Sequence, residues 1–368
     1  MAASSKEELV GLTSLRGLAA LAVVMQHFSS TAQKLCEVTI PSLVPHGYVA
    51  VDFFFVLSGY VMCYTYLQAF QARVPGTYAS FLKKRAVRLL PLNAFVVIAL
   101  LLAAPISTAL LGRNIFFGDI QIPFDVMANL LMLQGLGVGM NMNGPSWSVS
   151  AELLAYLLFP ALIVGAFSRR RAVVVTVGLA AVAGLICIAL RNPRLGLGSE
   201  DPLFGGLRCV SQFTVGMLAY RLSTWPRAAA WFAQDRVAFG WIALCLLLLA
   251  LRVDLLTAMT FPFVIVATAL NRTRLDRLLS LRPLTVLGLA SYSLYLIHDP
   301  FRPVVLELVR ALHPAPLGAP AALLLALVAS LAVIPFAVLT YHFVEKPSRT
   351  YLRRLIGNAA GLGQWAKR

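Results

Sequence analysis

Two basic side chains interrupt the first apolar stretch of the sequence, and their spacing could serve catalysis. Arg16 and His27 are eleven residues apart, so a helix would place them about 20° from the same face and roughly 16 Å apart along its axis. A histidine can act as a general base near neutral pH, whereas long basic side chains at the ends of a span can also simply extend toward water. The pair therefore predicts either a catalytic histidine or two interfacial side chains.

Two carboxylates are expected at the depth of His27. Asp52 falls near the start of the apolar segment 48–68, and Glu152 lies within the first two turns of 146–167. A carboxylate at that depth could orient or charge-pair the imidazole, and ionised groups inside a membrane are costly without a partner. We therefore expect Asp52 or Glu152 to assist His27, the alternative for Asp52 being a position at the edge of a loop.

Small and aromatic residues accompany both carboxylates. Ser58 and Gly59 lie near the middle of segment 48–68, where they could let a ligand approach the backbone or let two helices pack closely. Trp147 and Ser148 precede Glu152, and a serine at such a position could instead cap the helix. These residues are candidates for ligand binding, with helix packing and capping as the alternatives.

The segment 286–310 carries a polar stripe. Spacings of four, three and four residues align Ser291, Tyr295, His298 and Arg302 on one helix face. Pro300 is expected to kink or break this helix and to free backbone carbonyls that must face protein or water. The stripe predicts either a buried site or a structural cluster of Tyr and His.

A basic cluster precedes the segment 89–111. In the string FLKKRAVRLLP, Arg85 and Arg88 are three residues apart on one helix face, and guanidinium groups with this spacing suit phosphate groups. Basic clusters beside a membrane also bind anionic lipids or fix topology. The cluster therefore predicts a phosphate site or a contact with membrane lipids.

The composition places these residues in a membrane protein. Of 368 residues, 59% are apolar and 12% are charged, whereas soluble domains average about 45–50% and about 25%. This excludes a soluble globular chain, so we assign the net charge of +16 to membrane topology and expect no nucleic-acid partner. The sequence contains no Walker loop, GxSxG, HExxH or Cys/His metal spacing, so we expect no metal site and none of those enzyme classes.

The apolar segments predict an all-α, polytopic membrane protein with about ten transmembrane helices. The stretch 126–140 is short and interrupted by glycine, so it is predicted to be re-entrant or interfacial, with an eleventh helix as the alternative. Most Lys and Arg residues fall in segments on the N-terminal side of the membrane, so both termini are expected to be cytoplasmic. One transmembrane domain is expected over 1–345, followed by a basic cytoplasmic tail over 346–368. The ten predicted spans are 12–30, 48–68, 89–111, 146–167, 172–190, 203–221, 229–251, 254–270, 286–310 and 318–343.

Five strings resemble the acyltransferase-3 family of bacterial inner-membrane acyltransferases, in the family's order and over most of the chain: LTSLRGLAALAVVMQHF, VDFFFVLSGYVM, FLKKRAVRLLPL, GPSWSVSAELLAYLLFP and SYSLYLIHDP. The resemblance implies a multi-pass protein of the bacterial inner membrane that moves an acyl group from cytoplasmic acyl-CoA to a hydroxyl at the outer side. The implied acceptor is a carbohydrate or lipid-linked glycan, such as O-antigen, exopolysaccharide or another cell-surface glycan. Acyl-CoA, with acetyl-CoA expected, is implied as a co-substrate, and no cofactor is expected to be permanently bound.

The family's motifs also imply roles for individual residues. Its Arg-x10-His pattern falls on Arg16 and His27, with His27 as the expected catalytic residue. Its Arg-x-x-Arg pattern falls on Arg85 and Arg88, which would hold the donor. Some members carry an SGNH hydrolase-like domain, which this sequence lacks, so the stand-alone type is expected. The SWS…E element of the family falls on Trp147, Ser148 and Glu152.

Elementary chemistry agrees with these roles. A sugar hydroxyl attacks a thioester slowly unless a base removes its proton, which His27 oriented by Asp52 or Glu152 could do, and we expect direct transfer without an acyl-enzyme. The donor would be bound by Arg16, Arg85, Arg88, Ser58 and Gly59. The acceptor or the oxyanion would be bound by Trp147, Ser148, Tyr292, Tyr295 and His298.

Two other functions remain compatible with these residues. A proton-coupled polytopic transporter or flippase would also carry ionisable groups inside its spans. A non-catalytic membrane partner in a polysaccharide-assembly complex is the second alternative. The residues specify neither the acceptor nor the oligomeric state.

Overall fold

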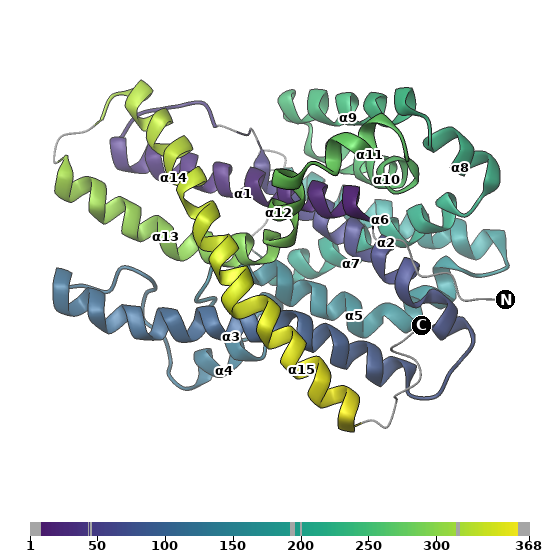
Figure 1. Ribbon diagram of the computed structural model, residues 1–368, viewed down its shortest axis with the longest axis horizontal. Helices are drawn as coiled ribbons and strands as arrows, with labels where there is room; N and C mark the ends of the chain where they lie inside the picture. Colours follow the sequence, from purple (N-terminus) through teal and green to yellow (C-terminus); the bar gives the residue numbers. More distant parts are fainter. Residues whose placement is uncertain are drawn as a thin grey trace.

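A computed structural model describes residues 9–42, 44, 46–191, 196–198, 201–313 and 317–359, and within these ranges every regular element is a helix (Figure 1). The predicted all-α class is therefore confirmed. The end of the predicted basic tail, 360–368, lies outside the described residues. The helices are α1 (Val10–Cys36), α2 (Ala50–Gln71), α3 (Thr77–Leu111), α4 (Phe124–Leu130), α5 (Ser146–Ala166), α6 (Arg171–Arg191), α7 (Pro202–Ser223), α8 (Pro226–Phe232), α9 (Asp235–Ala250), α10 (Asp254–Leu270), α11 (Arg274–Leu279), α12 (Arg282–Leu289), α13 (Ser291–Leu312), α14 (Ala319–Thr340) and α15 (Lys346–Ala359).

Six of these helices, in the described ranges, are long and apolar enough to cross a membrane, and α8 with α9 would add a seventh if they form one span despite a bend of 72°. The six are α1, α2 with the turn before it, α3, α5, α6, and α14 with its continuation into α15. The helices α7 and α13 contain 22 residues each, but charged side chains such as Arg208 and Asp299 lower their hydropathy. The predicted number of about ten spans is therefore not confirmed, and the cytoplasmic location of both termini stays a prediction.

Two of the predicted segments are broken in the structure. The segment 229–251 is divided between α8 and α9, and the segment 286–310 is divided between α12 and α13. The stretch 126–140 forms only α4, with seven residues, and a single 3-10 turn. That helix is too short to cross a membrane, which agrees with the prediction of a re-entrant or interfacial segment.

The sequence predicted a kink or a break at Pro300. The helix α13 runs without interruption through Pro300 and Pro303, so it is not broken there, and the kink stays a prediction. Proline still removes one backbone donor, which leaves the carbonyl four residues earlier without its usual partner. That carbonyl belongs to Leu296, and the side-chain amide of Asn143 donates to it at 3.0 Å. A polar side chain from outside the helix thus replaces the missing hydrogen bond.

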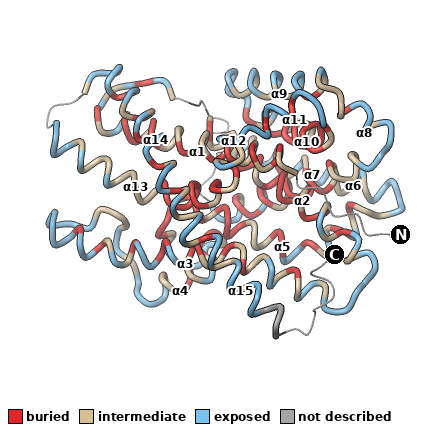
Figure 2. Tube along the Cα trace, in the orientation of Figure 1, coloured by how far each residue is buried: buried red, intermediate tan, exposed pale blue. Residues whose placement is uncertain are grey.

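The interior of the bundle forms around α2, and Figure 2 shows buried residues gathered where α1, α2, α5 and α7 meet. In the most apolar window of α2, 72% of the residues are buried, against 17% for α6. The helices α2 and α7 touch through Gly59 and Gly216, where a Cβ would collide with the carbonyl oxygens of Phe213 and Val56 respectively. Glycine is needed at both positions because it lets the two backbones approach closely.

This contact predicts a stability difference between two glycines. We expect Gly59→Ala to destabilise the protein by about 1–3 kcal/mol because the added methyl overpacks the interface of α2 and α7. Gly240→Ala is the matched control, since a Cβ there meets open space and alanine favours a helix over glycine. Thermal unfolding in detergent should show a lower midpoint for the first variant and an unchanged or higher one for the second. Equal midpoints would contradict this packing.

Candidate active site

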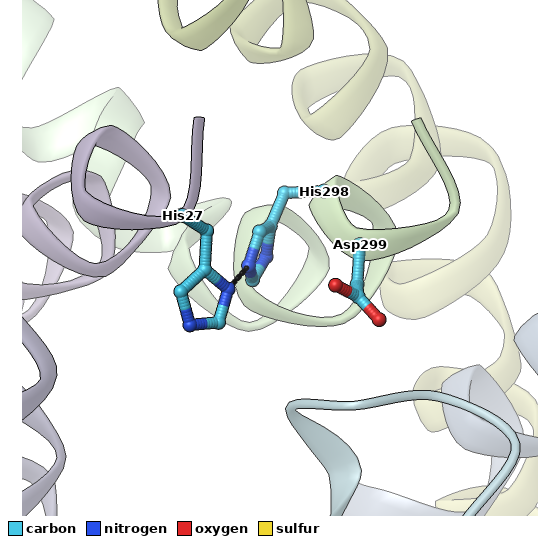
Figure 3. A group of neighbouring side chains, drawn as sticks. All are labelled: His27, His298 and Asp299. Carbon is cyan, nitrogen blue, oxygen red and sulfur yellow. Dashed lines mark hydrogen bonds between the residues drawn. The ribbon is translucent and has the colours of Figure 1, made fainter. Parts of the chain in front are cut away.

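The helices α1 and α13 bring two histidines together (Figure 3). His27 Nδ1 lies 2.9 Å from His298 Nε2, and the ring centroids are 5.0 Å apart. His298 is fully buried, and His27 is partly buried. A separation of 2.9 Å between ring nitrogens is that of a hydrogen bond, so one ring donates a proton to the other.

The neighbour of His298 decides which ring is the donor. His298 Nδ1 lies 3.2 Å from the carbonyl oxygen of Leu294, and a carbonyl can only accept, so we assign the proton of His298 to Nδ1. The Nε2 atom of His298 then holds a lone pair and accepts from Nδ1 of His27. The Nε2 atom of His27 is thereby left with a lone pair, which is the form of imidazole that can take a proton from a substrate.

Asp299 and Arg302 lie beside the histidine pair on α13. Arg302 pairs with Asp299 at 2.6 Å and donates through Nε to Thr31 Oγ1 at 2.9 Å. Thr31 in turn donates to the carbonyl oxygen of His27 at 3.0 Å. This chain of contacts joins the two helices one turn beyond the histidines and fixes their relative position.

The carboxylates expected beside His27 have other partners. Asp52 is fully buried and accepts from Arg208 of α7 at 2.8 Å and 2.5 Å, and from Gln212 at 3.3 Å. Glu152 accepts from Tyr156, one turn along α5, at 2.5 Å. Neither carboxylate therefore makes the expected contact with His27. Asp52 serves as the counter-ion that the buried Arg208 guanidinium requires, and Glu152 lines a cavity that does not include His27.

Glu152 lines a cavity of about 340 Å³, called the arginine cavity here. Most of the residues expected to form the site line this cavity. Its walls come from α1, α2, α3, α5 and α13. Gly59 lies at the α2–α7 contact, and the ring of Trp147 packs edge-on against Phe55 with the Arg208 guanidinium over its face. The expected site residues that line the arginine cavity are Arg16, Ser58, Arg85, Arg88, Ser148, Glu152, Tyr292 and Tyr295.

Two arginines of this cavity have only neutral hydrogen-bond partners among the described residues. Arg16 donates to Ser291 Oγ at 2.8 Å and to the carbonyl oxygen of Gly288 at 3.0 Å. The Arg85 guanidinium lies 5.6 Å from the ring centroid of Tyr66 and 5.9 Å from that of Tyr156. The buried Nε of Arg85 has no hydrogen-bond partner within the part of the chain described. These cations keep donors available for an anionic ligand.

The third arginine is held by a residue that the sequence analysis missed. Glu345 is 1% exposed and accepts from Arg88 at 2.9 Å, Ser293 at 2.8 Å and Arg349 at 3.2 Å. It ends the π-helical turn Tyr341–Glu345 that joins α14 to α15, and such turns often occur at functional sites. A lone acidic residue among the basic residues that follow the last apolar segment was the available signal.

The tyrosines and His298 expected to stabilise an oxyanion already have acceptors for their protons. Tyr292 donates to the carbonyl oxygen of Leu89 at 2.8 Å. Ser148 donates to the carbonyl oxygen of Pro145 at 3.0 Å, so we assign the proton in the 2.7 Å contact between Ser148 and Tyr295 to the tyrosine. In this arrangement His298 also has no free proton, since its Nδ1 faces Leu294. Their expected role would require these bonds to rearrange.

Three atoms near the pair could also serve as metal ligands. One ligand atom each from His27, His298 and Asp299 lies within 4.8 Å of the others. The two imidazole nitrogens that face one another are, however, in hydrogen-bond contact. The geometry therefore describes a proton-sharing pair with an adjacent carboxylate.

If the ion pair of Asp52 and Arg208 is structural, variants of these two residues should change the thermal stability of the protein in a specific way. Asp52→Ala should destabilise the protein by about 3–5 kcal/mol because it leaves a buried guanidinium without a counter-ion. The double variant Asp52→Ala with Arg208→Met removes both charges and should recover most of the thermal stability in detergent. A double variant that is no more stable than Asp52→Ala would contradict the structural role of this pair.

Comparison with known proteins identifies the family. A family model described as an acyltransferase domain, of the acyltransferase-3 family, matches residues 9–341. The protein named "Putative peptidoglycan O-acetyltransferase YrhL" from Bacillus subtilis (strain 168) is 27% identical over 370 residues, which cover 92% of this chain and 55% of that protein. "Acyltransferase MdmB" from Streptomyces mycarofaciens is 29% identical over 161 residues, 41% of this chain and 38% of its own length. The chain thus spans about half the length of YrhL, and its match to MdmB covers 38% of that protein. No solved structure matches the chain significantly. Because the family model covers nearly the whole chain, the protein belongs to the acyltransferase-3 family.

Proposed function

We propose that this multi-pass membrane acyltransferase transfers an acetyl group from acetyl-CoA to a hydroxyl of a cell-envelope glycan, at the outer side of the bacterial inner membrane. In this proposal the arginine cavity receives the donor from the cytoplasm, and His27 is the general base. The O-acetyltransferase name of YrhL supports the acetyl group and a glycan acceptor.

The observation that carries the proposal is the hydrogen bond between His27 and His298. It gives His27 a fixed tautomer whose Nε2 lone pair faces away from His298 (Figure 3). A base that removes a hydroxyl proton needs such a lone pair within reach of the substrate. His298 acts as a positioning residue for His27, the part that Asp52 or Glu152 was expected to play.

The arginine cavity supports the donor half of the reaction. Its three guanidinium groups, from Arg16, Arg85 and Arg88, face a space of about 340 Å³. Phosphates bind well to arginine because the planar group donates two parallel hydrogen bonds. The phosphates of CoA would bind at these cations. Tyr295, which lines the cavity, lies one helical turn before His298 in α13.

The chemistry requires one proton acceptor and no covalent enzyme intermediate. The Nε2 atom of His27 takes the proton of the acceptor hydroxyl as its oxygen attacks the thioester carbonyl carbon. The tetrahedral intermediate then collapses, the C–S bond breaks, and the imidazolium returns the proton to the CoA thiolate. The products are the O-acetyl ester and CoA, and the imidazole is restored.

Donor binding can be tested without knowledge of the acceptor. We expect purified protein in nanodiscs to bind acetyl-CoA saturably, and Arg85→Ala with Arg88→Ala to weaken that binding at least about tenfold, since each charge-assisted contact contributes about 1.5–3 kcal/mol. Arg113→Ala is the control, because this exposed arginine pairs with Glu307 away from the cavity. Isothermal titration would measure all three proteins. A folded wild type that does not bind acetyl-CoA would favour the transporter alternative.

The histidine pair predicts a graded loss of transfer. His27→Ala should lower acetyl transfer by about 10²–10⁴-fold, as expected for loss of a general base. His298→Gln should retain more activity than His298→Leu, because a glutamine oxygen can still accept from His27 Nδ1. The measurement is labelled acetate released from the glycan fraction of cells that express each variant at equal protein level. Full activity in His27→Ala would remove the base assignment, and equal activity of both His298 variants would remove the positioning role.

A further inference from the structure

A second cavity, of about 270 Å³, was not expected from the sequence. Neither histidine lines it, but Asp299 does, and ligand atoms of Asp299, His27 and His298 lie within 4.8 Å of one another. We call this second cavity the Asn143 cavity. Its polar lining residues are Thr31 and Lys34 of α1, Asn143 before α5, and Asp299 and Arg302 of α13, and most of the remaining wall is apolar and includes Phe116. An apolar cleft with a few convergent polar groups is the usual form of a small-molecule site.

Asn143 has a buried atom that points to a ligand. The residue is 2% exposed, and its Nδ2 is committed to the Leu296 carbonyl that Pro300 leaves free. This contact fixes the orientation of the amide, because the opposite orientation would place two oxygens together. The Oδ1 atom has no hydrogen-bond partner in the described part of the chain. A buried carbonyl oxygen without a partner is costly, and a hydroxyl in the cavity would satisfy it.

The cavity also has more positive than negative charge. Asp299 accepts from Arg302 Nη1 at 2.6 Å and from the backbone N–H of Gly144 at 3.0 Å, so both carboxylate oxygens are engaged. Arg302 uses Nε for Thr31 and Nη1 for Asp299, which leaves its Nη2 group available. Lys34 is exposed and makes no ion pair among the described residues. One carboxylate therefore faces two cations, which favours a ligand that brings its own acid group.

The contacts of the lining residues place this cavity next to the proposed base. Thr31 donates to the backbone carbonyl of His27, and Asp299 directly follows His298 in α13. Figure 3 shows the Asp299 side chain leaving α13 beside the two imidazoles. Neither Thr31 nor Asp299 lines the arginine cavity. The two cavities are therefore separate spaces with different lining residues.

We propose that the Asn143 cavity binds the acyl acceptor, and that this acceptor is an acidic sugar. A sugar hydroxyl donates to Asn143 Oδ1, the carboxylate of the sugar faces Lys34 and Arg302, and a second hydroxyl is presented to His27. This inference rests on the proposed function and adds to it a binding site and a substrate class.

The test uses two probes that differ in one group, methyl β-D-glucuronide and methyl β-D-glucoside. Saturation-transfer NMR titrations of the 368-residue protein in nanodiscs should show about tenfold tighter binding of the glucuronide, as expected for a charge-assisted contact. Lys34→Gln should reduce this preference to about twofold or less. Arg310→Gln is the matched control, because this exposed cation of α13 pairs with Glu307 outside the cavity, and it should keep the preference.

Asn143→Leu tests the hydroxyl contact. It should weaken binding of both probes about fivefold, the effect of one hydrogen bond, and thermal unfolding would check that the variant is folded. Lys34→Gln, at an exposed position, keeps the proposal testable if Asn143→Leu does not fold. Equal affinity for the two probes, binding of neither, or a preference that survives Lys34→Gln would overturn the proposal.

Acetyl-CoA titration of the same preparations separates this proposal from the proposed function. Lys34→Gln and Arg310→Gln should bind acetyl-CoA as the wild type does. Normal binding of acetyl-CoA together with no preference between the sugars would overturn the acidic-acceptor site alone. Loss of acetyl-CoA binding by the wild type would instead contradict the proposed function.

Discussion

The cost of placing polar side chains inside an apolar helical bundle determines how this protein is assembled. Without water, a buried donor, acceptor or charge is costly unless it finds a partner within the protein. The hydrogen bond from His27 to His298 is the central case, since it joins α1 to α13 and also sets the tautomer of both rings. Thr31, Arg302 and Asp299 extend that connection by one turn. The contacts that hold the helices together thus also set the tautomers on which the proposed chemistry depends.

The need of buried charges for partners also distinguishes the Asp52–Arg208 pair from the arginines of the arginine cavity. Arg208 and Asp52 neutralise each other between α7 and α2 and leave little capacity for a ligand. Around the arginine cavity the balance is different, because Arg16 and Arg85 have only neutral partners and Glu345 is shared by Arg88 and Arg349. An excess of guanidinium groups over carboxylates is stable only where an anion or water can approach. This excess supports the proposal that the arginine cavity binds an anion, in contrast to the neutral pair of Asp52 and Arg208.

The two cavities give the histidine pair two neighbourhoods of different chemistry. The arginine cavity offers cations, tyrosines and a long apolar wall, whereas the Asn143 cavity offers a buried amide oxygen and a few charges near an aromatic ring. Tyr295 lines the arginine cavity, Asp299 lines the Asn143 cavity, and His298 lies between them in α13, with its ring centroid 6.1 Å from that of Tyr295. A transferase that joins two dissimilar substrates requires such an arrangement, because each substrate must be recognised separately while the reacting atoms meet at one base.

The sequence by itself determined the all-helical membrane class of the protein, the approximate position of most long helices, and eight of the residues that line the arginine cavity. Composition and apolar length are local properties, and the spacings of Arg16, His27, Arg85 and Arg88 can be read directly because helical geometry is regular. Only the tertiary structure decided which side chains meet. Asp52 was expected to assist His27 but faces Arg208, which is 156 residues away, and Glu345, Asp299 and Asn143 acquired their importance through contacts between distant helices. Helix rotation and partner choice depend on packing across the whole bundle, and no local pattern encodes them.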